Sequence, residues 1–485
     1  MAARANGGYR VVIGLEVHAQ LLTESKMFCA CSAKYADAPP NTVVCPICLG
    51  MPGVLPVINE QAVEMTILTG LALNCRIPAH AKFDRKNYAY PDLMKWYQIS
   101  QYDLPFCVGG HLDVTVDGID RRLGITRVHL EEDTARMIHG RDEAGEDYSL
   151  LDVNRSGAPL MEIVSEPDMK TAAEAREYLM SLRNILVYLD VSTANMQEGA
   201  FRCDANISVW PRDGEIGNSK VEVKNMNSFR SVYRALEFEE KRQIAVWESG
   251  NGPPEQETRG WHEASGTTVS QRTKEYAHDY RYFAEPDLPP LVLDEAWVGE
   301  IAARMPELPS ALEHRLIEQV GIRPDDARQL INNRELLRYF EEAAASYGDP
   351  QRVANWITRD LVKALGDAGA SPSESPVGPG DLIELLKLED SNRVSGKMAR
   401  DIFRTMFETG RSAAEIVAQQ GEQITDQDEI RQAVVKAIQE NPKAVADFQA
   451  GKKQAAGFLV GRVMRATRGR ANPARVNELI AAELG

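Results

Sequence analysis

Acids, histidines and basic residues occupy every second position in four stretches of the sequence that alternate polar with apolar residues. In Ile13–His18 the polar side chains are Glu16 and His18, about 7 Å apart along an extended strand. A pair at this spacing can bind one metal ion, and carboxylates suit Mg²⁺. The pattern recurs in three further stretches: Arg127–Glu131, Asp204–Val209 and Lys220–Lys224.

These stretches predict β-strands, because side chains two residues apart leave a strand on the same face. If the strands share one sheet, a single polar face presents a set of candidate metal ligands: Glu16, His18, Glu131, Asp204 and Glu222. The alternative is that each stretch is a half-solvated antiparallel strand with ordinary surface charge.

The sequence contains neither a GxxxxGK[ST] loop nor a GxGxxG turn, so no P-loop or dinucleotide fold is indicated. The phosphates of a bound nucleotide must then be held by metal ions and basic side chains. The basic residues available for phosphate oxygens are Arg85, Lys86, Arg127 and Lys224. For Asp84, Arg85 and Lys86 a local salt network is the alternative.

Four of the seven cysteines form two close pairs, Cys29-x-Cys31 and Cys45-x-x-Cys48, separated by thirteen residues. Thiolates at such spacing can converge on one tetrahedral Zn²⁺, and Pro46 favours a tight turn. The alternative is that the four thiols are reduced and bind no metal. The other three read as small buried apolar residues: Cys75, Cys107 and Cys203.

The clearest polyanion-binding segment lies near the end of the chain. Between Lys452 and Arg475 there are seven basic residues and no acidic one, although the whole chain has 55 Lys+Arg against 71 Asp+Glu. If the segment is a helix, Arg462, Arg465 and Arg468 lie on one side of it, and Lys452 and Lys453 come shortly before them in sequence. Phe458, Leu459 and Met464 are expected to pack the helix onto its domain. The alternative is a solvated basic helix face.

The chain as a whole reads as a globular protein, with 44% apolar and 26% charged residues. Residues 1–294 mix strands with a few helices, of which 172–189 and 228–248 are clear. Prolines at 286 and 289–290 mark a break, and the rest is helical. We expect domains at 1–294, 295–410 and 411–485. Ten of the fifteen residues in 366–380 are Gly, Pro or Ser, which predicts a mobile loop that does not pack.

No signal peptide and no run of about 18 apolar residues is visible, so we expect no membrane association and a cytoplasmic location.

Eight segments in order resemble the B subunit of aspartyl/glutamyl-tRNA(Asn/Gln) amidotransferases, the GatB/GatE family, over essentially the whole chain. They are VIGLEVHAQL from Val12, KFDRKNYAYPD from Lys82, YQISQYD from Tyr97, GITRVHLEEDTA from Gly124, EIVSEPDM from Glu162, FRCDANIS from Phe201, EVKNMNSF from Glu222 and DYRYFAEPDLPP from Asp279.

The resemblance implies an α+β fold: an N-terminal antiparallel-sheet cradle of the glutamine synthetase type that binds ATP, followed by all-helical domains and a C-terminal tail that binds tRNA. It implies a carbon–nitrogen ligase with glutamine as nitrogen donor. ATP would phosphorylate the side-chain carboxylate of misacylated Glu-tRNA(Gln) or Asp-tRNA(Asn), and ammonia would then displace phosphate. The catalytic residues implied are Glu16, His18, Glu131 and Glu222.

Further roles follow from the same resemblance. The Mg²⁺ ligands implied are Glu16, His18, Glu131, Glu132, Asp204 and Glu222, although Glu132 could instead form an exposed ion pair with Arg136. The four-cysteine cluster occurs in some members of the family, which favours a structural staple. Tyr280, Arg281 and Tyr282 suit stacking on a tRNA end, or else a packed strand.

Partners are implied by chemistry that the chain lacks. We find no Cys-His signature and no Ser-rich amidase signature, so ammonia has to come from a separate glutaminase (A) subunit, with a small stabilising (C) subunit. Two other functions are compatible with the sequence: a non-catalytic tRNA-binding scaffold, and a small-molecule carboxylate kinase or amide ligase. The sequence does not distinguish Glu-tRNA from Asp-tRNA as substrate.

Overall fold

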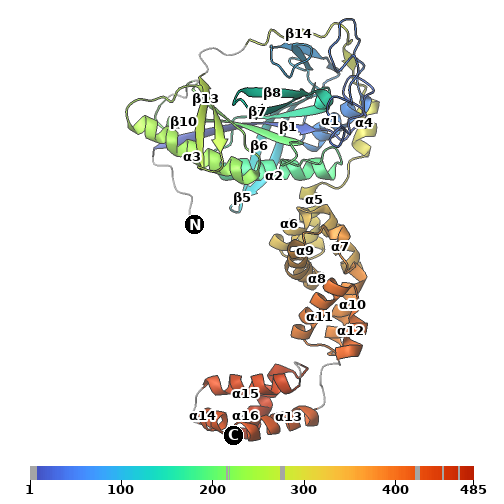
Figure 1. Cartoon of the computed structure of the whole chain (residues 1–485), viewed down its shortest axis with the longest axis vertical. Coiled ribbons are helices and arrows are strands. Elements are labelled where there is room, and N and C mark those ends of the chain that lie inside the picture. Colours follow the sequence, from blue (N-terminus) through green and yellow to red (C-terminus); the bar gives the residue numbers. More distant parts are fainter. Residues whose placement is uncertain are drawn as a thin grey trace. The chain divides into compact units, whose positions relative to one another are not determined.

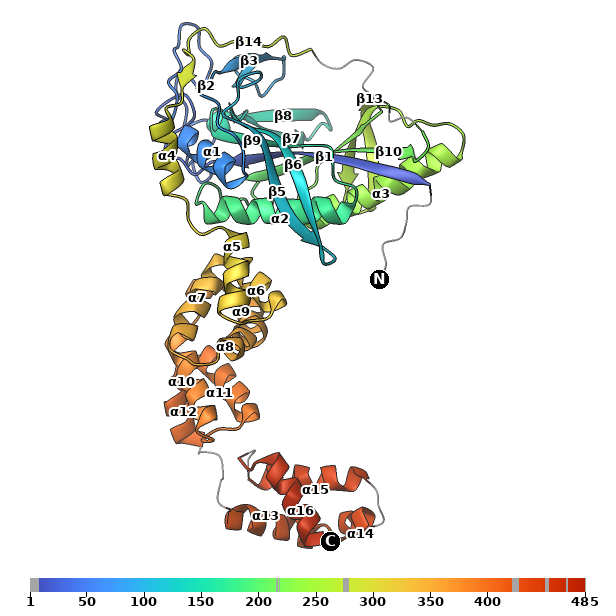
Figure 2. The ribbon, with the colours of Figure 1, turned by 180° about the vertical axis from the view of Figure 1, so that it is seen from behind.

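The computed structural model describes residues 8–214, 217, 219–273, 279–420, 427–449, 453–467 and 470–484. The chain divides into two compact units, 1–309 and 310–485. The first is α+β and the second is helical (Figures 1 and 2). No helix in the described ranges is both long and apolar enough to cross a membrane.

The first unit is built on a large sheet with strand order β13-β12-β11-β10-β1-β9-β6-β5, in the part of the chain that the structure describes. All neighbouring strands are antiparallel except β11 and β12, which are parallel, so the sheet is mixed rather than wholly antiparallel as expected. Its strands are β1 (Tyr9–Gln20), β5 (Cys107–Val116), β6 (Ile119–Glu132), β9 (Pro159–Ser165), β10 (Phe201–Pro211), β11 (Val221–Lys224), β12 (Glu257–His262) and β13 (Thr267–Thr273).

The four alternating stretches lie in β1, β6, β10 and β11, and the prediction that they share one sheet is confirmed. Burial alternates from Phe201 to Val209 in β10, where the apolar side chains are buried and the polar ones are partly exposed. The same alternation holds from Leu15 to Gln20 in β1. The sheet therefore has an apolar face and a polar face.

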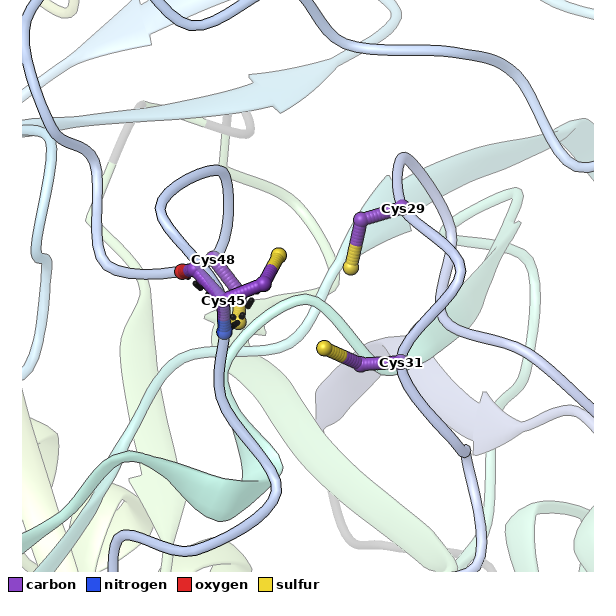
Figure 3. A group of neighbouring side chains, drawn as sticks. All are labelled: Cys29, Cys31, Cys45 and Cys48. Carbon is purple, nitrogen blue, oxygen red and sulfur yellow. Dashed lines mark hydrogen bonds between the residues drawn. The ribbon is translucent and has the colours of Figure 1, made fainter.

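Helices cover the apolar face. They are α1 (Glu60–Ala72), α2 (Ala172–Tyr188) and α3 (Phe229–Glu248), capped by the side chains of Asn59, Thr171 and Ser228 respectively. The two helices predicted at 172–189 and 228–248 are confirmed. Between β1 and α1 runs a long loop that carries the four paired cysteines (Figure 3).

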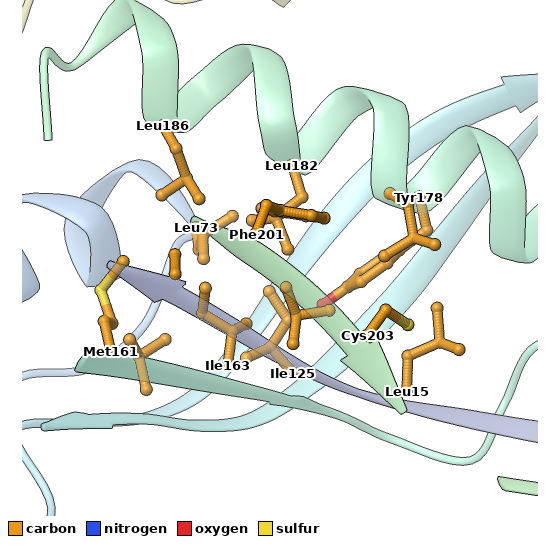
Figure 4. Close-up of a cluster of buried hydrophobic side chains, with 14 of the residues drawn as sticks. Leu15, Leu73, Ile125, Met161, Ile163, Tyr178, Leu182, Leu186, Phe201 and Cys203 are labelled. Atoms are coloured by element: carbon orange, nitrogen blue, oxygen red, sulfur yellow. The ribbon is translucent and has the colours of Figure 1, made fainter. Parts of the chain in front are cut away.

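The core of this unit lies between α2 and the sheet (Figure 4). Tyr178, Leu182 and Leu186 are directed from α2 toward the strands, and each is fully buried. The side chains that they approach are Leu15, Ile125, Ile163, Phe201 and Cys203. Cys75, Cys107 and Cys203 are all buried, as predicted.

Small sheets complete the first unit. They are β14-β3-β4 (Phe283–Ala284, Asp84–Asn87, Tyr97–Ser100), β15-β2 (Leu291–Val292, His80–Ala81) and β7-β8 (Arg136–Arg141, Asp147–Asp152). The sheet β14-β3-β4 lies on the opposite side of the large sheet from α2 and α3 (Figures 1 and 2). It therefore faces the polar side.

Packing does not stop at residue 294, where the first domain was expected to end. Helix α4 (Glu295–Ala303) buries Ile301 completely in the core of the first unit, and Met305 and Leu308 pack against that core. The first compact unit therefore extends to Pro309.

The second unit is helical, as predicted. Its elements up to residue 420 are α5 (Pro309–His314), η2 (Arg315–Gln319), α6 (Pro324–Ile331), α7 (Arg334–Ala345), α8 (Pro350–Trp356), η3 (Ile357–Leu361), α9 (Val362–Ala368), η4 (Pro372–Glu374), α10 (Pro379–Asp390), α11 (Gly396–Thr409) and α12 (Ala413–Gln420). Ile416 and Val417 of α12 are buried, so packing continues past the expected boundary at 410.

The expectation that 366–380 does not pack is wrong. Val377 is 1% exposed, and its carbonyl accepts a hydrogen bond from the Tyr339 hydroxyl at 3.1 Å. Ser371 and Glu374 bond each other, and the Ser373 backbone N–H donates to Glu335. One buried valine and a set of local caps are enough to fix a segment whose composition is that of a linker.

The last helices form a bundle with its own core: α13 (Gln427–Glu440), α14 (Pro442–Gln449), α15 (Lys453–Ala466) and α16 (Pro473–Leu484). Val434, Leu459, Val463 and Val476 are fully buried there.

Candidate functional site

The polar face brings together side chains from four neighbouring strands. His18 of β1 is paired with Glu162 of β9 on one side and with Arg202 of β10 on the other. Glu162 is in turn paired with His129 of β6. Directly paired residues have side chains about 5 Å apart on the same face. A row across four strands therefore reads His129, Glu162, His18, Arg202.

Two members of this row, His18 and Glu162, form with Glu131 of β6 what we call the His18 group. His18 Nε2 lies 3.4 Å from a Glu162 oxygen and 3.7 Å from a Glu131 oxygen. One ligand atom from each of the three residues falls within 4.8 Å of the others. Two carboxylates and an imidazole at this separation fit a single divalent cation.

The charges within the group are strongly coupled. Burial lowers the pKa of His18, but its hydrogen bond to Glu162 and the charges of Glu162 and Glu131 raise it more, to about 8. Burial would raise the pKa of Glu162, yet His129 and His18 hold it well below its usual range. Glu162 is therefore an ionised carboxylate in a buried position, available to a cation.

Lys86, on β3 of the small sheet, is placed over this face. Burial lowers the pKa of its ammonium, but the nearby carboxylates of Glu131 and Glu162 raise it above the ordinary value. The Ser100 hydroxyl of β4 donates to Glu131 at 3.3 Å. The small sheet thus adds a fixed positive charge beside the His18 group, and phosphate binding by Lys86 stays a prediction.

Three buried nitrogens on the same face have no hydrogen-bond partner among the described residues: the N–H donors Arg127 Nε and Arg202 Nε, and the ring nitrogen His129 Nδ1. A buried polar atom without a partner is costly, and such atoms are rare in folded proteins. Their gathering around the His18 group fits a site for an anion such as a phosphate.

A second group lies beside the first and contains the other predicted ligands. Glu16 accepts a hydrogen bond from Asn206 at 3.0 Å and is paired across the strands with Asp204. Lys224 forms ion pairs with Asp204 and, at 3.2 Å, with Glu222. We call Glu16, Asp204, Glu222 and Lys224 the Glu222 group. Here a lysine ammonium lies between two carboxylates.

Two predicted residues have other partners. The Glu132 carboxylate binds the Lys95 ammonium and the Ile99 backbone N–H, and adjacent strand residues face opposite ways, so it does not join Glu131. Arg85 forms a bidentate ion pair with buried Glu285, with both N–O distances 2.7 Å. Metal binding by Glu132 and phosphate binding by Arg85 stay predictions that these contacts do not support.

The segment 280–282 lies beside β3. Tyr282 stacks on Tyr102 with ring centroids 4.3 Å apart and 7° between the ring planes. Tyr280 meets the Tyr88 ring edge-on, and the Lys86 ammonium lies 5.1 Å from the centre of the Tyr280 ring. Arg281 is exposed. Aromatic rings beside a cationic site suit the binding of nucleotide bases, and stacking of this segment on a tRNA end stays a prediction.

The four paired cysteines converge in the loop between β1 and α1 (Figure 3). Their sulfur atoms all lie within 4.8 Å of one another, and those of Cys45 and Cys48 are 3.8 Å apart. When an ion binds four sulfur atoms tetrahedrally at about 2.3 Å each, the sulfur atoms lie about 3.8 Å from one another, which is the distance found between Cys45 and Cys48. The arrangement fits one structural Zn²⁺.

The surroundings favour negative charge in this loop. A hydrogen bond from Cys29, the Cys45 backbone N–H and buried Lys26 lower the pKa of Cys48 to about 4, although burial opposes this. Burial is the main cause that raises the pKa of Cys31, to about 11. Cys48 is therefore more readily ionised than Cys31, and a bound cation would favour the ionised form of Cys31.

We predict that the purified protein carries about one Zn²⁺ per chain. Cys45→Ser should lower the zinc content and the thermal stability before it alters chemistry, because the loop lies outside the polar face. Cys203→Ser, in the core and away from the loop, is the matched control and should keep the zinc. Metal analysis after reducing, chelator-free purification checks this, and a wild-type protein without zinc would exclude the site.

In the last bundle, α15 presents the predicted basic side. Arg462 and Arg465 are exposed, and Arg462 lies 5.7 Å from the centre of the Phe458 ring. Leu459 is buried as expected, but Phe458 is 51% exposed, so the prediction that it packs the helix onto the bundle is wrong. Lys452 and Arg468 lie outside the described residues, as does the side chain of Lys453.

Sequence reasoning missed three residues of the row: His129, Glu162 and Arg202. Glu162 is the only charged residue of β9, whose other positions are almost all apolar because the strand is central in the sheet. Polar and apolar residues therefore do not alternate along β9, and the pattern used to find the other strands does not identify it. A lone acid inside an apolar strand was the available signal.

Comparison with known proteins agrees with this geometry. Residues 11–299 match the family model described as the GatB/GatE catalytic domain, and residues 338–484 match the one described as the GatB domain. The first alone covers more than half of the chain. The chain belongs to the GatB/GatE family.

Several GatB/GatE relatives, each named as the B subunit of an aspartyl/glutamyl-tRNA(Asn/Gln) amidotransferase, match along almost their entire length. The relative from Thermomicrobium roseum is 55% identical over 476 residues, which is 97% of this chain and 98% of the relative. The relative from Carboxydothermus hydrogenoformans is 50% identical, over 97% of this chain and 98% of its own length. The one from Moorella thermoacetica is 52% identical, over 97% and 99%. The resemblance seen in the eight segments is thereby confirmed.

Proposed function

We propose that this chain is the B subunit of a tRNA-dependent amidotransferase and carries its ATP-dependent active site. The reaction converts Glu-tRNA(Gln) or Asp-tRNA(Asn) into Gln-tRNA(Gln) or Asn-tRNA(Asn). The observation that carries the proposal is the convergence of the His18 group, Lys86 and the unpaired buried Nε–H groups of Arg127 and Arg202 on one face, in a chain that belongs to the GatB/GatE family.

The polar face suits phosphoryl transfer. A side-chain carboxylate does not react with ammonia, because oxide would have to leave. Transfer of the ATP γ-phosphoryl group to a carboxylate oxygen gives an acyl phosphate and ADP. This step brings the negative carboxylate close to the negative phosphoryl groups of ATP, so fixed positive charges are needed to stabilise the transition state. Lys86 and Arg127 supply positive charge beside the His18 group, and Lys224 supplies it in the Glu222 group.

The second step releases phosphate. Ammonia attacks the acyl carbon, the bond from carbon to the phosphate oxygen breaks, and the amine loses a proton to give the amide. The released phosphate can accept this proton, because its oxygens are more basic than the Glu162 carboxylate, whose pKa is held well below its usual range. Ammonia would come from glutamine hydrolysed by a glutaminase (A) subunit, with a small (C) subunit completing the assembly.

Mg²⁺ fits the His18 group, because carboxylates dominate its ligand set. His18, Glu131 and Glu162 would hold one ion, and the carboxylates of Glu16, Asp204 and Glu222 offer a second set. Bound there, Mg²⁺ would neutralise charge on the phosphoryl groups of ATP. A cradle of the glutamine synthetase type is part of this proposal, and the polar sheet face lined with carboxylates supports it.

Substrate tRNA would contact two regions. The stacked Tyr102 and Tyr282, with Tyr280 and Arg281, would bind the aminoacylated end near the polar face. Arg462, Arg465 and Phe458 of α15 would bind another part of the tRNA, together with Lys452, Lys453 and Arg468.

The test is ATP turnover by the complex reconstituted from this chain and its A and C subunits. We expect ADP to form in step with amidated tRNA, and only when misacylated tRNA is present. Amidation that continues when the polar face is disabled would make the chain a tRNA-binding scaffold. ATP-dependent amidation of free glutamate or aspartate would make it a small-molecule ligase.

A further inference from the structure

Arg202 ends the row of polar side chains, and the two reaction steps above give its guanidinium no specific ligand. It is paired with His18 across β1 and β10, and its charge acts on both His18 and Glu131. The guanidinium is therefore next to the carboxylates that we propose as metal ligands. Its side chain as a whole is 37% exposed, although its Nε atom is buried.

One end of the guanidinium is fixed. Arg202 NH2 donates to Asp133 Oδ2 at 2.7 Å, and Asp133 is buried with only 2% of its side chain exposed. The other Asp133 oxygen accepts from the Thr134 backbone N–H at 2.9 Å. Asp133 is thus an anchor that cannot turn away from the arginine.

The anchor is itself held from a distant loop. Gln20 Nε2 donates to the same Asp133 oxygen at 2.8 Å, and Gln20 also bonds the Tyr35 hydroxyl at 3.0 Å. Tyr35 lies in the loop between the two cysteine pairs. A continuous chain of contacts runs from this loop to the guanidinium: Tyr35, Gln20, Asp133, Arg202.

The free part of the guanidinium indicates a ligand. An arginine that serves only to neutralise a carboxylate usually bonds it through two nitrogens, as Arg85 does with Glu285. Arg202 binds Asp133 through NH2, and its buried Nε–H has no partner among the described residues. That N–H is left for an acceptor supplied by a substrate.

We propose that Arg202 binds an oxyanion during the reaction and that Asp133 positions it, with Gln20 and Tyr35 holding Asp133. The inference rests on the proposed function. The oxyanion is either the carboxylate of the aminoacyl group or the phosphoryl group in transfer, since both present oxygen acceptors to a guanidinium fork.

The test compares Arg202→Lys with the wild type in the full complex, using misacylated tRNA and ATP. Lysine keeps the charge that neutralises Asp133 but loses the fork. We expect amidation to fall about tenfold or more with thermal stability near that of the wild type. A raised KM for misacylated tRNA would identify the carboxylate as the ligand. A lowered kcat, with the KM for misacylated tRNA and the KM for ATP both unchanged, would identify the phosphoryl group as the ligand.

Two further variants test the positioning chain. Asp133→Asn should reproduce the defect, and the double variant with Arg202→Lys should be no worse than either one alone. Tyr35→Phe should cause a smaller change in whichever parameter, kcat or the KM for misacylated tRNA, changes in Arg202→Lys. The matched control is Arg122→Lys, which alters an exposed bidentate pair with Asp113 on the β5–β6 hairpin and should leave the kinetics unchanged.

Unchanged kcat and KM values in Arg202→Lys would overturn the inference, and so would a loss that follows only the fraction of complex that assembles. Failure of the proposed function looks different, because the wild-type complex itself would then form no amidated tRNA.

Discussion

Replacing Glu162 with glutamine is expected to slow ATP-dependent amidation by about 10²-fold or more. Glu162 is the buried, ionised carboxylate that contacts both His18 and His129, and glutamine keeps its shape but removes its charge. A site that must hold phosphoryl groups against a carboxylate loses a cation ligand, and loss of one such electrostatic contact typically costs this much. Initial rates of amidated tRNA formation measure it.

The same loss is expected for His18→Ala and for Glu222→Ala, which change each of the two groups on the face. Glu166→Gln is the matched control, because Glu166 follows directly after β9 and its exposed carboxylate binds only the Thr126 hydroxyl among the described contacts. Complex assembly and tRNA binding should survive in all four variants. Loss of stability with near-normal amidation per folded molecule would show that the polar face is structural.

Reversing two charges on α15, Arg462→Glu with Arg465→Glu, is expected to weaken tRNA binding roughly tenfold or more. Both side chains are exposed, and together they contribute to a basic stretch that contains no acid. The logarithm of the binding constant falls linearly with the logarithm of the salt concentration. Each phosphate contact that is lost should make this slope shallower by about one unit. Titration of labelled tRNA at several salt concentrations measures both effects.

A control with the same change in net charge is Lys436→Glu with Lys443→Glu, on exposed positions of α13 and α14. It should change affinity and slope less. Glutamine hydrolysis by the glutaminase partner should stay normal in both double variants, since that reaction occurs elsewhere. Equal effects of the two double variants would mean that overall charge, rather than the α15 side, governs binding.

The sequence predicted the sheet well because strand periodicity is a local property. Glu16 and His18 alternate with buried residues, and every polar stretch identified by its period lies in the same sheet. Helix α3 was predicted for a similar reason, since its apolar residues recur with helical spacing and Ser228 caps it.

Contacts between residues far apart in the sequence could not be predicted from local sequence patterns. Asp133 and Arg202 are 69 positions apart, and only the order of strands brings them together. Glu285 reaches Arg85 across 200 positions and gives that arginine a partner that no motif around residue 85 reveals. Spacing showed which residues are able to bind ions, whereas the fold decides which of them are already paired.

Burial of single residues explains the remaining differences. The stretch 366–380 has the composition of a linker, yet Val377 anchors it against α7. Phe458 directly precedes buried Leu459, so it lies about 100° around the helix from that side chain, and it is exposed beside Arg462 at the surface. In both cases one side chain decides the outcome, and average composition does not identify it.

The central claim is that the chain phosphorylates a carboxylate before ammonia attacks. It is tested most directly with misacylated tRNA whose side-chain carboxylate carries ¹⁸O in both oxygens, incubated with ATP, glutamine and the full complex. If an acyl phosphate forms, one carboxylate oxygen leaves with phosphorus, and mass spectrometry should find one ¹⁸O in each inorganic phosphate produced. Phosphate without ¹⁸O, formed alongside amidated tRNA, would contradict the account.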